Sequence, residues 1–435
     1  MITRALTAVG IKEGHPYYRY WHSLRHSATN WLIILTGLLL YNGLNTIALI
    51  VIAPRVSKIE YGQYLACFAL ASFLVVMPGL GLDAWLLTQT PPSAAAATAL
   101  WYSAIRSRVG LLMAWAVGMV FLGFILPQET YPAVLLWPTI LGVALDQMLL
   151  ITFAALRLQG RHQAVTIWQT CSAAVLLGLA WGVPVGEGHI AWFAWGRTLL
   201  SLGVMGLIGG QLGRQFRREP QPITPSREIL QASRAFMVAE LATVVYIRAD
   251  LTLVSLLLGS LATSLYGPAI NLLQATFLAP RALFFFVVPA LSRLYTTRPT
   301  LFRLRSGQQF VAQIAVGLVI TPVLFFLGPA LITWLYQEQY AAAGDILRWL
   351  SPIPLLRASN FALGAILASA QKQPARTKVQ VAAAIFAVVA NVIVIRPYGL
   401  PGVAAVYVGS ETILALGYLF LCWPIWRSHS PVAGH

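Results

Sequence analysis

Long apolar runs dominate the chain, and short polar segments separate them. A helix that crosses a bilayer needs about 20 mostly apolar residues, and the sequence contains twelve runs of roughly that length. The runs cover residues 29–53, 62–86, 107–126, 131–156, 163–184, 189–212, 235–258, 264–291, 308–327, 344–369, 378–395 and 402–424. This pattern predicts an all-α polytopic membrane protein with about 12 transmembrane helices.

The polar stretch 214–234 is the longest interruption between the runs. It contains Pro220, Pro222 and Pro225, which prevent a continuous helix. We therefore expect a linker here, between two lobes of six helices each that surround a central cavity. The predicted division is an N-terminal segment 1–28, an N-lobe 29–213 (helices 1–6), the linker 214–234, a C-lobe 235–424 (helices 7–12) and a tail 425–435.

The composition fits this interpretation. Of 435 residues, 58% are hydrophobic and only 10% are charged, whereas soluble domains carry about 25% charged residues. The net charge is +16, which in a soluble protein would suggest nucleic-acid binding. In a membrane protein, basic residues instead accumulate in cytoplasmic loops, so no nucleic-acid partner is expected.

The positions of the basic residues predict the orientation. If the N-terminus is cytoplasmic and the runs alternate, 21 of the 29 Lys and Arg residues fall on the cytoplasmic side. Three fall outside, and five lie within the runs. This asymmetry favours an even number of spans, with both termini cytoplasmic.

An internal repeat is faint but present. Tyr61-Gly62 opens the second run, and Tyr266-Gly267 opens the eighth. A similar offset relates the ends of runs four and ten, at 154–163 and 365–374. Two copies of six spans would have the same orientation, an arrangement typical of transporters whose substrate path lies between the halves.

Charged side chains also lie inside the runs, where a charge near the bilayer centre costs about 2.5–3.5 kcal/mol. Such residues must face protein or a wet cavity, or pair with one another as structural links between helices. Arg248 and Asp250 are two residues apart and cannot face each other on a regular helix. Each needs a partner from another helix, or one of them faces the cavity. We expect Arg348, by contrast, to pair with Asp345 at the outer surface.

The candidate cavity residues fall into three groups. The candidate arginines are Arg197, Arg248, Arg281 and Arg357; the acids are Asp146, Glu240 and Asp250; and the neutral polar residues are Gln274 and Asn271. Gln274 and Arg281 are seven residues apart, so they share one helix face.

The three cysteines lie in apolar runs and resemble buried hydrophobes, so neither a metal site nor a disulfide is expected.

Several segments in order resemble the polysaccharide-transporter flippases. They are 49–64 (LIVIAPRVSKIEYGQY), 79–84 (GLGLDA), 248–259 (RADLTLVSLLLG), 265–273 (LYGPAINLL), 289–293 (PALSR) and 397–405 (PYGLPGVAA). The ordered set carries the resemblance, which extends from about residue 30 to the last run. The family's superfamily also contains multidrug extruders and the lipid II flippase, whose two additional C-terminal helices have no counterpart here.

The resemblance implies export of a polyprenyl-diphosphate-linked oligosaccharide, such as an O-antigen, capsule or exopolysaccharide unit, across a bacterial cytoplasmic membrane. Arginine suits the diphosphate, because its planar guanidinium pairs bidentately with phosphate oxygens and stays charged. Arg248, Arg281 and Arg357 are therefore the first candidates for the diphosphate site, followed by Arg197.

Two other functions compete. A cation-coupled multidrug or small-molecule antiporter of the same superfamily would favour acids in the cavity, and the acids within the runs keep this alternative open. A membrane enzyme is disfavoured, because the longest outer loop, 328–343, contains a single charge at Glu338. We expect no catalytic residues.

The energy source remains open. The chain has no G-x-x-x-x-G-K-[ST] loop for ATP, and no cofactor is expected. Export of an anion could draw on the membrane potential, or Asp146, Glu240 or Asp250 could couple transport to H⁺ or Na⁺. The expected partners are membrane lipids and the polymerase and glycosyltransferases of the same pathway.

Overall fold

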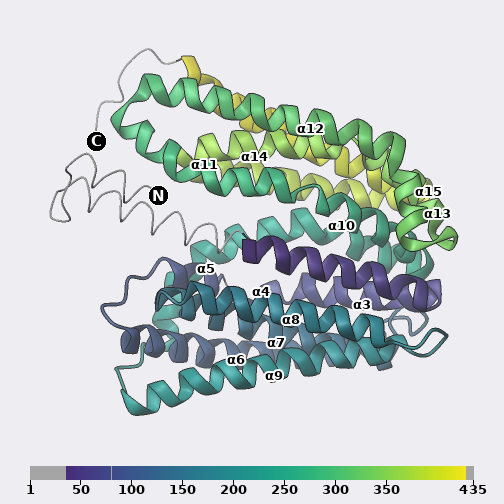
Figure 1. Ribbon diagram of the computed structural model, residues 1–435, viewed down its shortest axis with the longest axis horizontal. Helices are drawn as coiled ribbons and strands as arrows, with labels where there is room; N and C mark the ends of the chain where they lie inside the picture. The colour runs from purple at the N-terminus through teal and green to yellow at the C-terminus, as the bar shows by residue number, and fades with distance from the viewer. Residues whose placement is uncertain (1–35, 80, 428–435) are drawn as a thin grey trace, which may run out of the picture.

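The computed structural model describes residues 36–79 and 81–427, and every element within them is a helix (Figure 1). This confirms the predicted all-α fold class. The predicted segment 1–28 lies outside the described residues, as does the tail beyond residue 427.

The helices of the first half pack side by side in the lower part of Figure 1. They are the first helix, Thr36–Arg55, then α3 (Lys58–Leu74), α4 (Val76–Gly79), α5 (Leu82–Leu87), α6 (Ala94–Ile125), α7 (Ala133–Leu158), α8 (His162–Gly182) and α9 (Ile190–Arg218). The first helix ends in a 3₁₀ turn, Ala53–Arg55.

The helices of the second half follow α10 (Ser226–Ala275), which lies between the two groups. They are α11 (Leu278–Thr297), α12 (Pro299–Tyr336), the 3₁₀ turn Glu338–Tyr340, α13 (Ala341–Leu350), α14 (Ile353–Ser369) and α15 (Gln373–Arg427). The linker between the halves is shorter than predicted, because α9 extends to Arg218 and α10 begins at Ser226, leaving residues 219–225 non-helical.

Helix α10 is a hairpin of two helices that meet at Gly259, where φ is 81° and ψ is −171°. Residues 250 and 266 would be about 24 Å apart along a straight helix. Instead, the Tyr266 hydroxyl donates a hydrogen bond to Asp250 at 2.7 Å. The chain therefore reverses direction at Gly259.

Helix α15 is a hairpin of the same kind, with its break at Gly399 (φ 59°, ψ −146°). Gly417 approaches Val379, and Gly409 approaches Phe386, so the two segments run side by side. Ten described helices are long and apolar enough to cross a membrane, or eleven with the bent pair α13–α14. The breaks at Gly259 and Gly399 add a reversal of the chain within each of these two long helices.

Hydrogen bonds at helix starts fix some of the boundaries. Ser57 and Glu60 form a reciprocal capping box at the start of α3. At the start of α6, the Ser93 hydroxyl accepts a hydrogen bond from the Ala96 amide. Helix α6 therefore begins thirteen residues before the apolar run 107–126, with the consequence that Arg108 lies well inside it.

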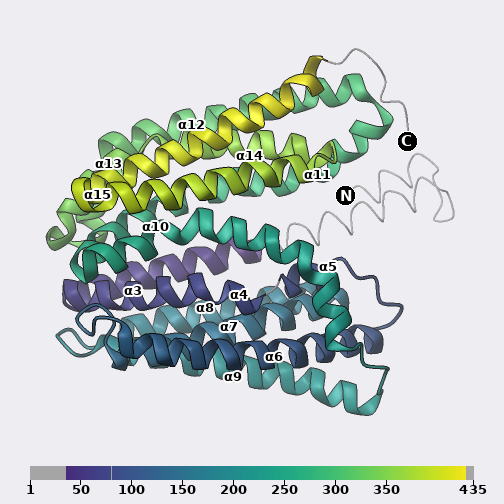
Figure 2. The same cartoon turned by 180° about the vertical axis from the view of Figure 1, so that it is seen from behind.

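In Figure 2 the two groups of helices converge toward one end, and among the described residues one core cluster joins both halves there. We call the end containing residues 219–225 the linker end and the opposite end, containing the two 3₁₀ turns, the distal end. One core cluster joins both halves at the distal end and includes Tyr61, Tyr131, Tyr266, Tyr336 and Tyr340. Toward the linker end, two separate clusters form, one around Trp85 and Trp101 and the other around Phe302 and Tyr418.

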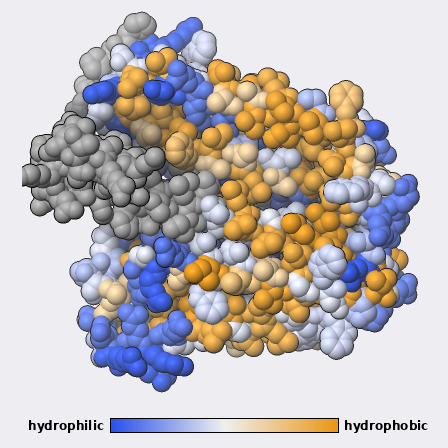
Figure 3. Space-filling model, viewed as in Figure 1, coloured by the Kyte–Doolittle hydropathy of each residue, from blue (hydrophilic) through white to orange (hydrophobic). Residues whose placement is uncertain are grey.

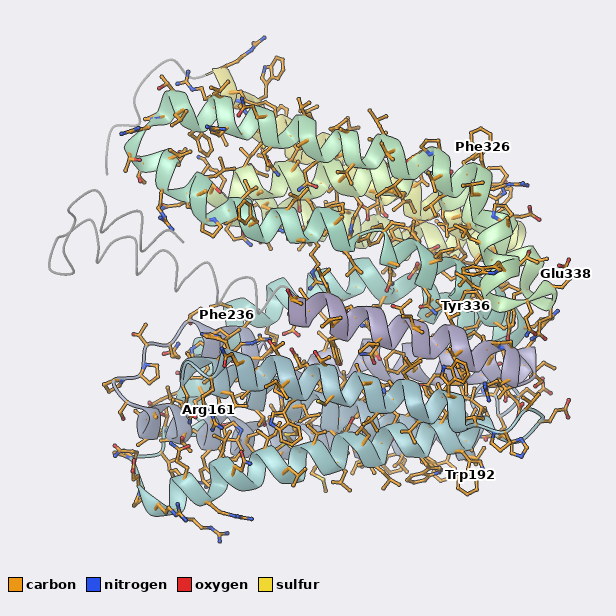
Figure 4. All side chains as sticks on the ribbon, in the orientation of Figure 1. Arg161, Trp192, Phe236, Phe326, Tyr336 and Glu338 are labelled. Atoms are coloured by element: carbon orange, nitrogen blue, oxygen red, sulfur yellow. The ribbon has the colours of Figure 1, made fainter. Side chains whose placement is uncertain are left out.

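The first part of α10 packs on the first half of the chain. Ile229 belongs to the cluster around Trp85 and Trp101, and the Thr224 amide donates a hydrogen bond to Ser103 Oγ at 3.1 Å. Gly81, at the start of α5, lies directly against Phe236, which Figure 4 labels. The beginning of helix 7 is thus held by the N-lobe, although the remainder continues into the C-lobe.

The outer surface is apolar along both halves, as Figure 3 shows for one face. Phe124, Phe326, Trp334 and Phe420 are each more than 70% exposed. A surface of this kind is disfavoured in water and favoured against lipid tails. Together with the apolar helices, it supports a multi-pass membrane protein.

Candidate functional site

A cavity of about 310 Å³ lies within the N-lobe and is bounded on one side by the first part of α10. Four of the predicted site residues line it: Asp146, Arg197, Glu240 and Arg248. Glu240 and Arg248 are eight residues apart with Val244 between them, so all three follow one stripe of α10.

Arg197 is held by an acid and a ring. Its Nη2 donates to Asp146 Oδ2 at 2.6 Å, and Ser201, one turn further along α9, donates to Asp146 Oδ1 at 2.8 Å. The guanidinium carbon lies 4.4 Å from the ring centre of Phe68. Arg197 thus combines both interpretations given to the charges in the runs: it lines a cavity, and it pairs with a carboxylate of a neighbouring helix.

Arg248 approaches the same ring, with its guanidinium carbon 5.9 Å from the centre of Phe68. Its side chain is exposed to the cavity. Asp250, two residues later, is buried and accepts hydrogen bonds from Tyr266 and from the Leu251 amide. The two residues do diverge, as their spacing predicts: one faces a cavity, and the other finds its partner on the next helix.

A second cavity, of about 440 Å³, lies within the C-lobe. Arg281 and Arg357 line it, together with Gln274 from the same helix stripe as Arg281. Arg376, from the start of α15, is a third lining arginine. Its guanidinium lies 5.7 Å from the ring centre of Phe284. Among the described residues that line this cavity there is no Asp or Glu.

Arg357 is fixed by groups on two helices. Its Nη1 donates to Glu411 Oε1 on α15 at 2.6 Å, and the Asn360 amide donates to Glu411 Oε2 at 2.6 Å. The guanidinium also lies 5.1 Å from the ring centre of Phe277 and 5.6 Å from that of Phe361. These contacts orient the arginine at the cavity wall.

The first helix stands between the two cavities. Tyr41 and Asn45 line the N-lobe cavity, whereas Asn42 and Thr46 line the C-lobe cavity. Each pair is spaced by four residues and forms one stripe, and the two stripes are offset by about 100° around the helix axis. The structure therefore divides the four predicted arginines into two pairs, instead of gathering them in one central cavity.

Two predicted cavity residues do not line either cavity. Asp250 and Asn271 lie in the packed region that follows the reversal at Gly259, near the distal end. Asn271 lies beside the hydroxyls of Tyr61 and Tyr336. The hairpin places this segment against α3, so these polar groups are enclosed by packed side chains. Arg348 and Asp345 form the expected exposed pair at 3.3 Å.

Two arginines that the charge count assigned to cytoplasmic segments lie inside the lobes. One is Arg376, described above. The other is Arg108, whose side chain is fully buried and donates to the backbone oxygens of Gly79 and Gln147. Its Nη2 lies 3.9 Å from Asp83. The sequence signal for this buried position is the N-cap residue Ser93. It starts α6 early enough to place Arg108 four turns into the helix. Among the described residues, no group of three or more His, Cys, Asp or Glu side chains could hold a metal ion.

Comparisons with known proteins place the fold. No protein-family model matches the chain, and no curated protein matches it. Among solved structures, the lipid II flippase MurJ in an inward closed conformation is similar, with a TM-score of 0.67, 14% identity, and coverage of 90% of this chain and 87% of that one. An inward-facing multidrug resistance MATE transporter of the MOP superfamily gives a TM-score of 0.65, 12% identity, and coverage of 91% and 98%.

An outward-facing structure of a MATE multidrug transporter gives a lower TM-score, 0.56, at 13% identity and coverage of 91% and 94%. The structural neighbours are thus MOP superfamily transporters of two kinds.

Proposed function

We propose that the protein is a flippase that moves polyprenyl-diphosphate-linked oligosaccharide units from the inner to the outer leaflet of a bacterial cytoplasmic membrane. The observation that carries the proposal is the C-lobe cavity, whose described lining residues include Arg281, Arg357 and Arg376 and no acid. A diphosphate is the part of such a cargo that cannot cross lipid alone, because a charge in hydrocarbon is strongly disfavoured.

The three arginines suit this ligand in different ways. Arg357 is pre-oriented by Glu411 and Asn360, so little side-chain entropy is lost when an anion binds. Arg281 is exposed on the cavity side of α11, directly after the break at residues 276–277. Guanidinium groups contact phosphate oxygens bidentately, so the diphosphate is proposed to lie among these three residues. Arg197 and Arg248, in the other cavity, are no longer the first choice for it.

Alternating access would move the cargo. The separate cores at the linker end would let a head group enter from the cytoplasm, and the shared core at the distal end would block its exit. Each negative charge that leaves a cytoplasm at −100 mV gains about 2.3 kcal/mol. Coupling to H⁺ or Na⁺ is a further source. The expected partners are the glycosyltransferases and polymerase that act before and after export.

A cation-coupled antiporter is the second candidate, and a specific observation favours it. The N-lobe cavity contains Asp146 and Glu240, and carboxylates suit a cationic cargo. However, Asp146 is already paired with Arg197 at 2.6 Å. An antiporter would bind an organic cation such as tetraphenylphosphonium and would not need the C-lobe arginines.

The deciding experiment uses the full chain in lipid nanodiscs and proteoliposomes. We expect the protein to bind inorganic pyrophosphate and to flip a fluorescent undecaprenyl-diphosphate saccharide. Arg281→Ala and Arg376→Ala should each weaken pyrophosphate binding about tenfold or more, because each removes a charge-assisted contact. Arg348→Ala, at an exposed pair away from both cavities, is the matched control and should leave binding unchanged.

Binding of tetraphenylphosphonium with no binding of pyrophosphate would assign the protein to the antiporters. Full flipping by both cavity variants would remove the assignment of the diphosphate to this cavity.

A further inference from the structure

The two cavities differ in electrostatic character. Among the described lining residues, the C-lobe cavity has three arginines, one of them paired with Glu411, and no acid, whereas the N-lobe cavity has two arginines and two acids. Arg197 and Asp146 neutralise each other at 2.6 Å. Glu240 and Arg248 lie on the same stripe of α10 and contribute opposite charges. The N-lobe cavity is therefore balanced and offers both hydrogen-bond donors and acceptors.

Neutral polar side chains complete the wall. Asn45, Gln147, Gln169 and Ser172 come from the first helix, α7 and α8, and all line the cavity. Amides donate and accept, and hydroxyls do both. The apolar part of the wall comes from residues such as Leu176 and Val204.

These features fit a neutral polyhydroxylated ligand better than an anion. A sugar presents hydroxyl groups that donate and accept at its rim, and C–H groups on its faces. A cavity with mixed donors, acceptors and apolar patches is complementary to that surface. A phosphate would gain no net attraction here, because the carboxylates of Asp146 and Glu240 offset the two arginines.

We propose that the N-lobe cavity is the saccharide subsite of the transporter and that it selects the sugars nearest to the diphosphate. This inference rests on the proposed function and assigns each part of the cargo to one lobe. The first helix makes the arrangement feasible, because its stripes Tyr41–Asn45 and Asn42–Thr46 face the two cavities and lie next to each other. A head group anchored in the C-lobe cavity can therefore extend past this helix into the N-lobe cavity.

Two glutamine variants form a matched pair. Gln169 lines the N-lobe cavity, and Gln380 lines the C-lobe cavity. Each glutamine becomes leucine, which has a similar size and no hydrogen-bonding group. Ser172→Ala is a second, smaller change in the N-lobe cavity. Thermal unfolding in detergent shows whether each variant folds like the unchanged protein.

Binding is measured in lipid nanodiscs with two probes. One is undecaprenyl diphosphate, and the other is the lipid-linked oligosaccharide extracted from host cells that lack this gene. We expect the saccharide to increase the affinity of the unchanged protein. Gln169→Leu should reduce that increase in affinity about fivefold to tenfold, because one hydrogen-bonding partner is lost. It should leave the affinity for undecaprenyl diphosphate unchanged. Gln380→Leu should weaken the binding of both probes by the same factor.

Three results would overturn the inference. One is that the saccharide adds no affinity in the unchanged protein. Another is that Gln169→Leu and Ser172→Ala both retain the full increase. In either case undecaprenyl diphosphate would still bind, so the proposed function would stand. The third result, no binding of undecaprenyl diphosphate at all, would overturn the proposed function together with the subsite.

Discussion

Arg357 and Glu411 form a buried ion pair, with side-chain exposures of 11% and 0%. Removing two charges from water carries a desolvation cost, which their attraction offsets only with good geometry and further hydrogen bonds. Asn360 supplies such bonds, since its amide donates both to the Glu411 carboxylate and to the Glu411 backbone oxygen. The pair therefore fixes α14 to α15 behind the C-lobe cavity.

We predict that Arg357→Ala destabilises the protein by about 3–5 kcal/mol, because the Glu411 carboxylate would remain buried without its counter-charge. The measurement is denaturant or thermal unfolding of the purified full chain in detergent. The double variant with Arg357→Met and Glu411→Leu should recover most of the loss, since it removes both charges.

Arg348→Ala provides the matched control. Its pair with Asp345 is also within ion-pair distance, at 3.3 Å, but the two side chains are 49% and 73% exposed. Exposed pairs contribute about 0.2–1 kcal/mol. Equal losses in Arg348→Ala and Arg357→Ala would contradict a special role for the buried pair.

For single residues, the sequence predicted which charged side chains lie within helices, but it did not predict which side chains they contact. The spacing of Arg248 and Asp250 predicted that they diverge, because this depends on helix geometry alone. The burial of Arg108 and the position of Arg376 depend on how the helices pack. Both lie where apolar runs give way to polar segments, so hydropathy places them at the surface.

Two elements, α10 and α15, owe their shape to single glycines. Gly259 and Gly399 combine φ of 81° and 59° with ψ of −171° and −146°. This region of backbone conformation is essentially restricted to glycine. A methyl group would find room at either position, because the nearest atom to a Cβ at Gly259 is 3.5 Å away and Gly399 has none within 4 Å. Any cost of substitution is therefore conformational.

We predict that Gly259→Ala and Gly399→Ala each lower the stability by about 1–3 kcal/mol, the cost of a strained backbone conformation. Unfolding of the purified variants in detergent measures this. Gly178→Ala is the control: Gly178 lies within α8, and a Cβ there meets nothing within 4 Å. Alanine stabilises a helix interior relative to glycine, so a similar loss at Gly178 would contradict the assignment.

The apolar runs predicted where most helices lie but not where they begin and end. A run records only the part of a helix that faces lipid or core. Helix α12 covers 38 residues, Pro299–Tyr336, whereas the corresponding run covers 308–327. The turns added at its start carry polar side chains such as Arg303 and Arg305, which hydropathy cannot assign to a helix, whereas those added at its end, 328–336, begin with Gly328 and Pro329, which are typical of a loop. For the same reason the linker is shorter than 214–234.

The whole molecule is held together at its distal end by tyrosines. The Tyr340 hydroxyl donates to the Ala53 oxygen at 3.0 Å, and its ring meets those of Tyr61 and Tyr336. The Tyr131 hydroxyl shares a hydrogen bond with Ser255 at 2.8 Å, joining the loop before α7 to α10. The contacts of Tyr340 with Ala53 and Tyr61, and of Tyr131 with Ser255, join the first half of the chain to α10 and the second half and close this end.

The faint sequence repeat has a structural counterpart at this closed distal end. Gly62 lies against the Ser260 backbone oxygen, and Gly267 lies against Leu65. The two Tyr-Gly pairs that suggested the repeat thus occur at the same crossing, between α3 and the second part of α10. Glycine at each position permits the close approach, and the tyrosines beside them, Tyr61 and Tyr266, are both fully buried.

A closed distal end and separate cores at the linker end give a directional prediction. Gln380→Cys, in the C-lobe cavity, should react with a membrane-impermeant maleimide added at the linker end, because that cavity lies on the side where the lobes do not share a core. Ser264→Cys, buried near the reversal at Gly259, should react from neither side. Cys171→Ser removes the one exposed native thiol among the described residues, since Cys67 and Cys422 are buried.

The two sides are distinguished by comparing intact cells with inverted membrane vesicles. Basic residues predict that the linker end is cytoplasmic, so Gln380→Cys should be labelled in inverted vesicles and protected in intact cells. Labelling in intact cells alone would contradict either the orientation or the closed distal end. Added undecaprenyl diphosphate should then slow labelling of Gln380→Cys, since both would occupy the C-lobe cavity. A labelling rate that is independent of this lipid would place the diphosphate elsewhere, even if the orientation is correct.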